Sequence, residues 1–541
     1  MNAARDVTHS ARRWWALVAI AASVLVVGLD LTVLNLALPT MAVSLHAGTS
    51  DLQWIVDSYS LVLAALILPA GLLGDRYGRK RLLVAALVLF GVSSAACAYA
   101  TSVGMLIAAR AVLGIGAAAI FPLALSVLPV LFGPEERQKA VAAIAGSTML
   151  SFPIGPIVGG YLLNHFWWGS VFLINVPVVV LALIAVTMLM PESRSERRPS
   201  IDVAGLVVSS AGLLALTYGF IKAGQDGWSD ATALALIAAG AAVLALLVVV
   251  ERRIARRGGQ PLADLQLFAS PGFRWGTILV TLVSFAMFGM FFALPQYFQE
   301  VQGTDALGSG VRLLPMVGGM LVGMVGGTRL SAPRSGGRAA PAGPRTIVTV
   351  GYLLMAAAMA VGALTTLSSS TGYVLAWVAL AGLGLGLVMP SAMGVALGAL
   401  SAERSGAGSA LITAMRQVGS TIGVAILGTI ISNIYADRVA ASAAHLPAAA
   451  ADAVRSSVGS GTAIAAKLGD SALLDTVRSA FVHGMDVMLW TCGGIAVGCA
   501  LLAVTFLRSR QASGATDASP QAVSGGAAAG PSAQDGSLSV N

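Results

Sequence analysis

Long apolar runs are the feature that most constrains how this chain can fold. The hydrocarbon core of a bilayer is about 30 Å thick and needs roughly 20 apolar residues of helix to cross it, because backbone polar groups in lipid must be satisfied within the segment. Across 541 residues the sequence is 57% hydrophobic and only 10% charged. We therefore predict an all-α integral membrane protein with fourteen transmembrane helices, near residues 14–38, 53–73, 82–100, 104–128, 140–163, 169–190, 203–222, 231–250, 275–298, 307–329, 345–366, 371–397, 407–432 and 483–507.

The distribution of charge sets the expected orientation of these helices. A net charge of +8 would suggest a nucleic-acid partner in a soluble protein. Here most Lys and Arg fall in the terminal segments and alternate loops, which is the positive-inside pattern. We therefore expect both termini in the cytoplasm and no nucleic-acid partner. The basic residues expected outside are Lys222, Arg312, Arg438, Arg455, Lys467 and Arg478.

The three cysteines, Cys97, Cys492 and Cys499, lie inside apolar runs. Their spacing matches neither a disulfide framework nor a metal site. We expect them to pack as small core side chains.

A short polar and basic stretch separates the second and third apolar runs. Gly71 and Gly78 would permit close backbone approach and a tight turn, and Asp75 could pair with Arg79 or cap a neighbouring helix. The cations mark this stretch as cytoplasmic. Its characteristic residues are Gly71, Asp75, Arg76, Gly78, Arg79, Lys80 and Arg81.

Two carboxylates lie in the first two predicted helices. Asp30 is more than ten residues into its apolar run, so it should face a cavity, hold a proton or pair with a cation. Thr32 and Asn35 could hydrogen-bond beside it. Asp57 and Tyr59 lie about one turn below the expected outer surface, where Asp57 is equally well interpreted as a solvated interfacial charge.

Two arginines are also placed inside predicted helices. Arg110 is interpreted either as a residue that couples proton and substrate movement or as half of a structural salt bridge. Arg416, followed by Gln417, either lines a cavity or pairs with a carboxylate. Three soft side chains could add cavity walls, although for each one individually an apolar, lipid-facing position is the favoured interpretation: Met320, Met415 and Phe285.

The fifth predicted helix carries a glycine-rich motif made of Gly146, Gly155, Pro156, Gly159 and Gly160. Glycines four residues apart let two helices pack closely, and a proline inside a helix kinks it. Small-residue packing explains the motif without any function, but two halves that rock against each other would also need such an interface.

Internal repeats indicate two related halves. Gly114-x-Gly116-x5-Pro122 recurs as Gly382-x-Gly384-x5-Pro390, and Ala37-Leu-Pro39 recurs as Ala293-Leu-Pro295. Both matches pair helix n with helix n+8, which predicts parallel repeats with a substrate site between them. The expected domains are an N-terminal six-helix bundle (1–200), two inserted helices (201–260), a C-terminal six-helix bundle (261–508) with an extracellular hairpin (433–481), and a disordered cytoplasmic tail (509–541).

Taken together, the segments around Asp30 and Asp57, the Asp75 loop, Arg110 and the glycine motif resemble the fourteen-helix drug:proton antiporter branch of the major facilitator superfamily, and in particular its quaternary-ammonium and multidrug exporters. The resemblance implies a major facilitator fold arranged as six, two and six helices. It also implies proton coupling and substrate binding by Asp30, Asp57 and Arg110, a gating role for the Asp75 loop, and an antiporter role for the glycine motif.

The predicted function is therefore proton-coupled export of amphipathic cationic or neutral drugs and antiseptics across the plasma membrane. We expect no enzymatic activity, no metal, no cofactor besides the proton gradient, and a monomer in the lipid bilayer. The alternative is a narrow exporter of one antibiotic made by the producing cell. Unlike the antiseptic pumps, the chain lacks further acids in its tenth and thirteenth predicted helices, which argues against divalent cationic substrates.

Overall fold

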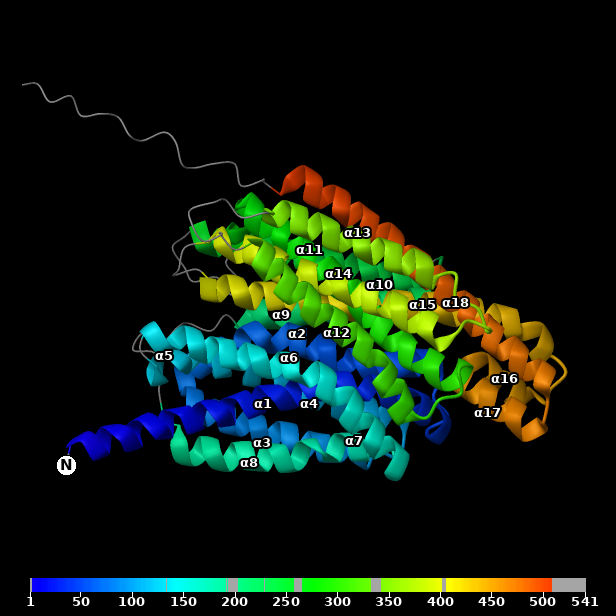
Figure 1. Cartoon of the computed structure of the whole chain (residues 1–541), viewed down its shortest axis with the longest axis horizontal. Coiled ribbons are helices and arrows are strands. Elements are labelled where there is room, and N and C mark those ends of the chain that lie inside the picture. The colour runs from blue at the N-terminus through cyan, green and yellow to red at the C-terminus, as the bar shows by residue number, and fades with distance from the viewer. Residues whose placement is uncertain are drawn as a thin grey trace, which may run out of the picture.

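The computed structural model describes residues 2–132, 134–190, 192, 203–227, 229–256, 265–331, 342–400 and 405–507. Within these ranges the chain forms helices and no strand, which confirms the all-α prediction (Figure 1). The predicted tail at 509–541 lies outside the described residues. Each of the fourteen predicted segments overlaps a long helix.

The first group of helices packs around α1 and α4. Helix α1 contacts α6 and α8, while α4 lies between α2 and α3. The elements of this N-terminal bundle are α1 (Asn2–Ser44), α2 (Thr49–Tyr77), α3 (Arg79–Ala98), α4 (Val103–Ser126), α5 (Leu128–Leu131), α6 (Pro134–His165), α7 (Ser170–Leu173) and α8 (Asn175–Leu189).

A second group has the same organisation around α11 and α14. Helix α11 contacts α15 and α18, while α14 lies between α12 and α13. The main elements of this C-terminal bundle are η1 (Leu265–Ala269), α11 (Pro271–Gln296), η2 (Tyr297–Val301), α12 (Ala306–Ser331), α13 (Pro344–Gly362), α14 (Thr371–Gly398), α15 (Ser405–Ala443) and α18 (Ser471–Phe506).

The repeated glycines make equivalent contacts in the two bundles. A Cβ added at Gly114 would lie 2.7 Å from the Tyr59 carbonyl oxygen on α2, and one added at Gly382 would meet the backbone of Met316 on α12. The second glycine of each motif meets the third helix of its bundle in the same way. The sequence repeat therefore corresponds to a repeat in packing, in which small residues let helices approach closely.

Two further helices lie between the bundles in the chain. Helices α9 (Val203–Asp226) and α10 (Ala231–Arg256) pack against each other, and α9 also contacts α2 and α15. The rings of Trp54 on α2 and Tyr218 on α9 lie 5.5 Å apart. The inserted pair is thus attached where the two bundles meet.

The predicted hairpin is shorter than its expected range of 433–481. Helix α15 continues to Ala443 and α18 begins at Ser471, so only α16 (Ala448–Ser456) and α17 (Val458–Leu468) form the short helical pair. Ser457 accepts a hydrogen bond from the Ser460 amide at the start of α17, and Gly469 ends that helix with a positive φ of 66°.

Eleven helices of the described chain are long and apolar enough to cross a membrane. Helices α2, α6 and α9 overlap predicted spans but are not among those eleven. The chain is therefore a multi-pass helical membrane protein with about eleven apolar spans.

Hydrogen bonds between the bundles gather at the end of the molecule that carries α16 and α17, which we call the hairpin end (Figure 1). Gln299 donates to the Leu36 carbonyl at 3.0 Å, and Gln53 donates to the Ala425 carbonyl at 3.3 Å. Thr49 donates to the carbonyl of Ser456 in the hairpin at 2.9 Å. These bonds hold the bundles together at the hairpin end.

Candidate functional site

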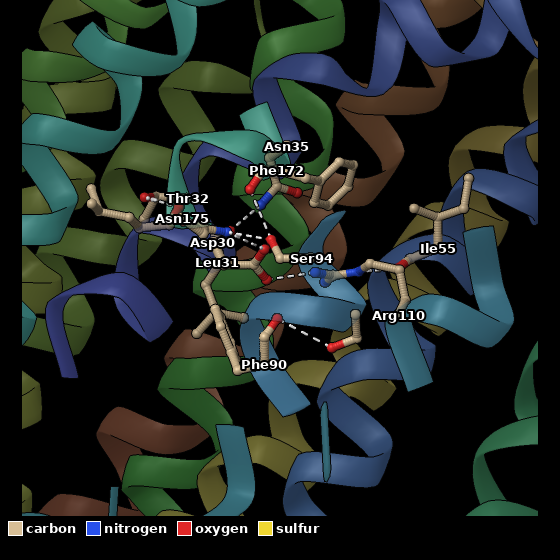
Figure 2. Close-up of polar contacts among 12 residues, drawn as sticks. Asp30, Leu31, Thr32, Asn35, Ile55, Phe90, Ser94, Arg110, Phe172 and Asn175 are labelled. Carbon is tan, nitrogen blue, oxygen red and sulfur yellow. Dashed lines mark hydrogen bonds and ion pairs between the residues drawn. The ribbon is translucent and has the colours of Figure 1, made fainter. Parts of the chain in front are cut away.

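Asp30 is bound by partners from two other helices (Figure 2). The Arg110 guanidinium on α4 donates from Nη1 to Asp30 Oδ2 at 2.5 Å, and Asn175 on α8 donates from Nδ2 to Asp30 Oδ1 at 3.3 Å. Asp30 is 3% exposed and Arg110 is 0% exposed, so the ion pair is withdrawn from solvent. Of the three expected alternatives for Asp30, a cavity, a bound proton or a paired cation, the structure shows the paired cation.

Arg110, on α4, connects three helices of the N-terminal bundle, because it contacts Asp30 on α1 and two residues of α2. Its Nε donates to the Ile55 carbonyl on α2 at 3.0 Å, and its guanidinium carbon lies 4.4 Å from the centre of the Tyr59 ring. The remaining Nη2 is buried without a hydrogen-bond partner among the described residues. A guanidinium keeps its charge in proteins, so this group fixes a positive charge beside Asp30.

The second layer around Asp30 comes from residues that the sequence analysis missed. Asn175 also contacts Ser94 Oγ at 3.1 Å, and Ser94 donates to the Phe172 carbonyl at 2.8 Å (Figure 2). Both are polar residues inside apolar spans, which is the signal that could have identified them. Ser94 and Asn175 fix one face of the carboxylate.

Thr32 and Asn35 form hydrogen bonds near Asp30, but not with its carboxylate. Thr32 donates to the carbonyls of Gly28, Leu29 and Ser151, and Asn35 donates to the carbonyl of Leu31. A short side chain in a helix readily bonds to the backbone one turn earlier, and this local competition takes both groups away from the carboxylate.

Asp57 has a different environment from Asp30. Its side chain is 0% exposed, and neither carboxylate oxygen has a hydrogen-bond partner among the described residues. This excludes the interpretation of Asp57 as a solvated interfacial charge. An unpartnered buried carboxylate is costly if ionised, so such a group normally marks a place that takes up a proton, water or ligand.

The position of Asp57 on α2 relates it to the other bundle. Gln53, one turn earlier, donates to the Ala425 carbonyl on α15. Residues four apart share a helix face, so Asp57 lies on the α15 side of α2. The hydroxyl groups of Ser58 and Tyr59 are also buried without a partner among the described residues. Asp57 and Ser58 are therefore unused polar groups near the contact between the bundles, while the Tyr59 ring lies against Arg110 inside the N-terminal bundle.

Helix α15 carries Met415, Arg416 and Gln417. The amide nitrogen of Gln417 is buried without a partner, and Arg416 makes no ion pair in the described part of the chain. The alternative in which Arg416 is paired with a carboxylate is thus not observed. Met415 and Met320 are half-buried on different helices, and Phe285 is 8% exposed on α11.

The predicted polar turn is mostly helical. Helix α2 continues through Tyr77 and α3 begins at Arg79, so the turn is confined to Gly78, whose φ is 116°. A Cβ at Gly78 would lie 2.7 Å from a Glu192 oxygen. The turn therefore requires glycine for both its backbone conformation and its close approach to that carboxylate. The side chain of Asp75 lies outside the described side chains, as does the environment of Gly71.

Glu192, just beyond α8, is the acidic partner of this turn. It accepts a hydrogen bond from the Lys80 amide at 3.2 Å and forms a 3.7 Å ion pair with Arg81. Lys80 Nζ also donates to the Thr187 carbonyl at 2.6 Å. Within the local sequence only Asp75 offers an acidic partner for the cations of the turn, and the distant Glu192 gives no local signal. Arg76 lies over the ring of its neighbour Tyr77.

The glycine motif of α6 divides between two neighbours. Gly155 and Gly159 face α1. A Cβ added at Gly155 would lie 2.8 Å from Thr32 Cβ, and one added at Gly159 would lie 2.7 Å from Val33 Cγ1. Gly160 faces the other bundle, where an added Cβ would lie 2.5 Å from Leu307 Cα. The expected close packing is confirmed at these positions.

The remaining members of the motif behave differently from each other. The Pro156 backbone closely approaches Gly310 on α12, while nothing lies within 4 Å of a Cβ added at Gly146. Helix α6 is continuous through Pro156. Close packing therefore explains every member of the motif except Gly146.

No group of three His, Cys, Asp or Glu side chains in the described ranges is placed to hold a metal ion. The three cysteines are buried and free, as expected. The site consists instead of one buried ion pair, one unpartnered carboxylate and unused polar groups near the contact of two repeated helical bundles.

Such a two-bundle membrane architecture, with charged groups inside the spans, defines a secondary transporter. The family model described as Major Facilitator Superfamily matches residues 20–424. This chain belongs to the major facilitator superfamily, and it is a transporter and not an enzyme.

Curated relatives match along most of their length. The tetracenomycin C resistance and export protein of Streptomyces glaucescens is 35% identical over 508 residues, covering 91% of each chain. The multidrug efflux pump LfrA of Mycolicibacterium smegmatis is 34% identical, covering 88% of this chain and 92% of its own. The methyl viologen resistance protein SmvA of Salmonella typhimurium is 31% identical, covering 90% and 96%.

Solved structures show the same fold. A bacterial homolog of the human lysosomal transporter Spinster, in an inward-facing and occupied conformation, matches with a TM-score of 0.66 at 16% identity, covering 92% of this chain and 97% of the other. A D-xylose-proton symporter matches with a TM-score of 0.61.

Proposed function

We propose that this protein is a proton-coupled exporter of amphipathic cationic or neutral drugs and antiseptics in the plasma membrane. The observation that carries the proposal is Asp57, a fully buried carboxylate inside a spanning helix. It has no partner among the described residues and lies on the face of α2 that meets the other bundle. A carboxylate that binds a proton and a cationic ligand in turn must not already be paired with a cation of the protein itself.

The proposed topology has fourteen transmembrane helices, with α2, α6 and α9 crossing the membrane beside the eleven apolar spans. The two bundles then contain six helices each, and α9 and α10 form the inserted pair. Both termini and the Gly78 turn are placed in the cytoplasm, because basic residues cluster there. The hairpin end is therefore placed outside.

In the proposed cycle the hairpin end is closed and the drug enters from the cytoplasm. Ionised Asp57 attracts the cationic group, and protonation from outside releases it once the bundles have rocked. The Asp30–Arg110 pair couples this exchange to the positions of α1, α2, α4 and α8, which its hydrogen bonds join. Gly155, Gly159 and Gly160 provide close surfaces across which α6 moves relative to its neighbours.

Relatives support the exporter assignment. They include proteins named for multidrug efflux, for methyl viologen resistance and for resistance to puromycin. Their names cover chemically unrelated compounds, which favours broad drug export for this chain.

The test uses purified protein in liposomes without ATP, with ethidium as a monovalent cationic probe and an imposed pH gradient. We expect ethidium to move against its own gradient while the pH gradient lasts, and a protonophore to stop it. Ethidium transport that is independent of the pH gradient would contradict proton coupling. A failure to transport any tested cation would contradict drug export.

The second candidate is a narrow exporter of one antibiotic. The tetracenomycin C resistance and export protein is 35% identical over most of both chains, which favours this alternative. Susceptibility of a pump-deficient host to a panel of unrelated cations separates the two functions. Protection against several compounds supports the broad exporter, and protection against one supports the narrow exporter.

A further inference from the structure

Arg416 is a half-buried cation for which the described residues provide no acceptor. Its side chain on α15 is half-buried, so part of the guanidinium surface is not covered by protein. In the part of the chain that the structure describes, Arg416 has no hydrogen bond, ion pair or ring contact.

Three other arginines in or beside the spanning helices have partners. Arg110 pairs with Asp30, Arg312 donates to Gln302 at 2.9 Å, and Arg478 donates to the Glu300 carbonyl at 3.0 Å. A guanidinium has five N–H donors and cannot neutralise itself by losing a proton. Arg416 is therefore left with a full set of donors and a permanent charge.

The packing of α15 on α11 identifies what surrounds Arg416. Gly419 lies against Thr281 and Gly423 lies against Phe285, so the two helices run side by side with a constant offset. One turn further from the hairpin end, the same offset brings Met415 level with Thr277, and Arg416 is the next residue on α15. The Thr277 hydroxyl is buried without a hydrogen bond, as is the amide nitrogen of Gln417 next to Arg416.

This region of the C-terminal bundle is rich in donors and poor in acceptors. Helices α11, α12, α13 and α14 contain no Asp or Glu, and the acids of α15 and α18 lie toward the hairpin end. On α2, Asp57 faces α15 but is itself unpartnered. The described residues thus supply no anion to Arg416.

We infer that Arg416, with Gln417, binds an ionised acidic group of the exported molecule, such as a carboxylate or a phenolate. Arginine suits this role because its planar fork can donate two parallel hydrogen bonds to a carboxylate. Asp57 on the opposite bundle would take the cationic group of the same molecule. The favoured substrate is then an amphoteric, amphipathic molecule with its opposite charges directed to opposite bundles.

This inference rests on the proposed export function of the same site and extends its substrate class. It also gives the unpaired charges on the two bundles complementary roles. A substrate with both charges would bridge the bundles, whereas a simple cation would engage Asp57 alone.

Tetramethylrhodamine and its methyl ester provide a matched pair of probes. The free acid carries a carboxylate and the ester does not, while the cationic ring system is the same. Binding to purified protein in nanodiscs is measured by fluorescence anisotropy. We expect Arg416→Gln to weaken binding of the free acid by about tenfold to a hundredfold, the range for a charge-assisted hydrogen bond, and to leave binding of the ester unchanged.

The ester serves as the control for folding and for the proposed function. Arg416→Lys keeps the charge but loses the bidentate geometry, so we expect an intermediate loss for the free acid. Equal loss of both probes in Arg416→Gln would assign Arg416 a structural role and overturn the inference. So would wild-type protein that binds the ester but not the acid, a result that leaves cation export intact.

Discussion

Asp30 and Asp57 are both carboxylates inside spanning helices, but their surroundings give them different roles. Asp30 has a permanent cation and an amide donor. Asp57 has neither. Removing one partner of a buried ion pair leaves the other partner as an uncompensated charge. Neutralising a carboxylate that has no partner instead eliminates an uncompensated charge.

Asp30→Asn and Arg110→Gln should therefore each lower the free energy of unfolding by about 3–5 kcal/mol. The double variant should lose less than the sum of the two, because neither residual charge remains unpaired. Thermal unfolding of the four proteins in detergent measures the cycle. Strictly additive losses would show that the two side chains do not act as a pair.

Asp57→Asn should separate transport from stability. We expect it to abolish pH-driven ethidium efflux while leaving the unfolding temperature equal to or above that of the wild type, because no partner is lost. Val62→Ala, on the face of the same helix that packs against Gly114 of α4, is the control and should retain efflux. Full efflux by Asp57→Asn would remove Asp57 from the mechanism.

At the scale of helices, the glycine motif of α6 can be tested within itself. Gly160→Ala places a Cβ 2.5 Å from Leu307 Cα on the other bundle, so backbone must shift at the contact between the bundles. Gly146→Ala meets nothing within 4 Å. We expect Gly160→Ala to lower the efflux rate at least severalfold and Gly146→Ala to be tolerated.

The measurement is efflux per unit of folded protein, quantified by fluorescence size-exclusion chromatography. Equal activity in the two variants would mean that the close α6–α12 contact has no part in transport. Alanine is also a better helix former than glycine by about 1 kcal/mol, so loss of function in Gly160→Ala could not be assigned to a weakened helix.

Sequence patterns predicted the helices well because a spanning segment must be long, apolar and internally hydrogen-bonded. They were less accurate at the ends. Helix α2 runs on to Tyr77 and α15 runs on to Ala443, since polar residues that leave the apolar region can continue a helix. The Gly78 turn shows the limit of a local motif: its acidic contact comes from Glu192, which only the fold brings near.

The same limit applies to the site. Asp30, Asp57 and Arg110 stand out because an ionisable residue in an apolar run is rare. Asn175 and Ser94 are common polar residues and gain importance only from their contacts with the carboxylate. Whether a charge is paired depends on helix packing, and no spacing in the sequence distinguishes Asp30 from Asp57.

For the whole molecule, closure at the hairpin end predicts that a covalent link there will stop transport. A Cβ built on Gly48 would lie 3.4 Å from Ser456 Cβ, close to the Cβ separation of a disulfide. In the double variant Gly48→Cys and Ser456→Cys, oxidation should form a disulfide that abolishes efflux. Reduction of the disulfide should restore efflux. Each single variant is a control and should remain active under oxidation.

Full efflux by the oxidised double variant, with the disulfide verified by mass spectrometry, would show that opening at the hairpin end is not required. The native cysteines are buried, so they should not compete for the new thiols.

The central claim is that a buried carboxylate between the bundles exchanges a proton for cargo. Its most direct test is the release of protons when ethidium is added to purified protein in weakly buffered solution. We predict release by the wild type, none by Asp57→Asn and a reduced amount by Asp30→Asn. Release of the same size in the wild type and in both variants would contradict the account.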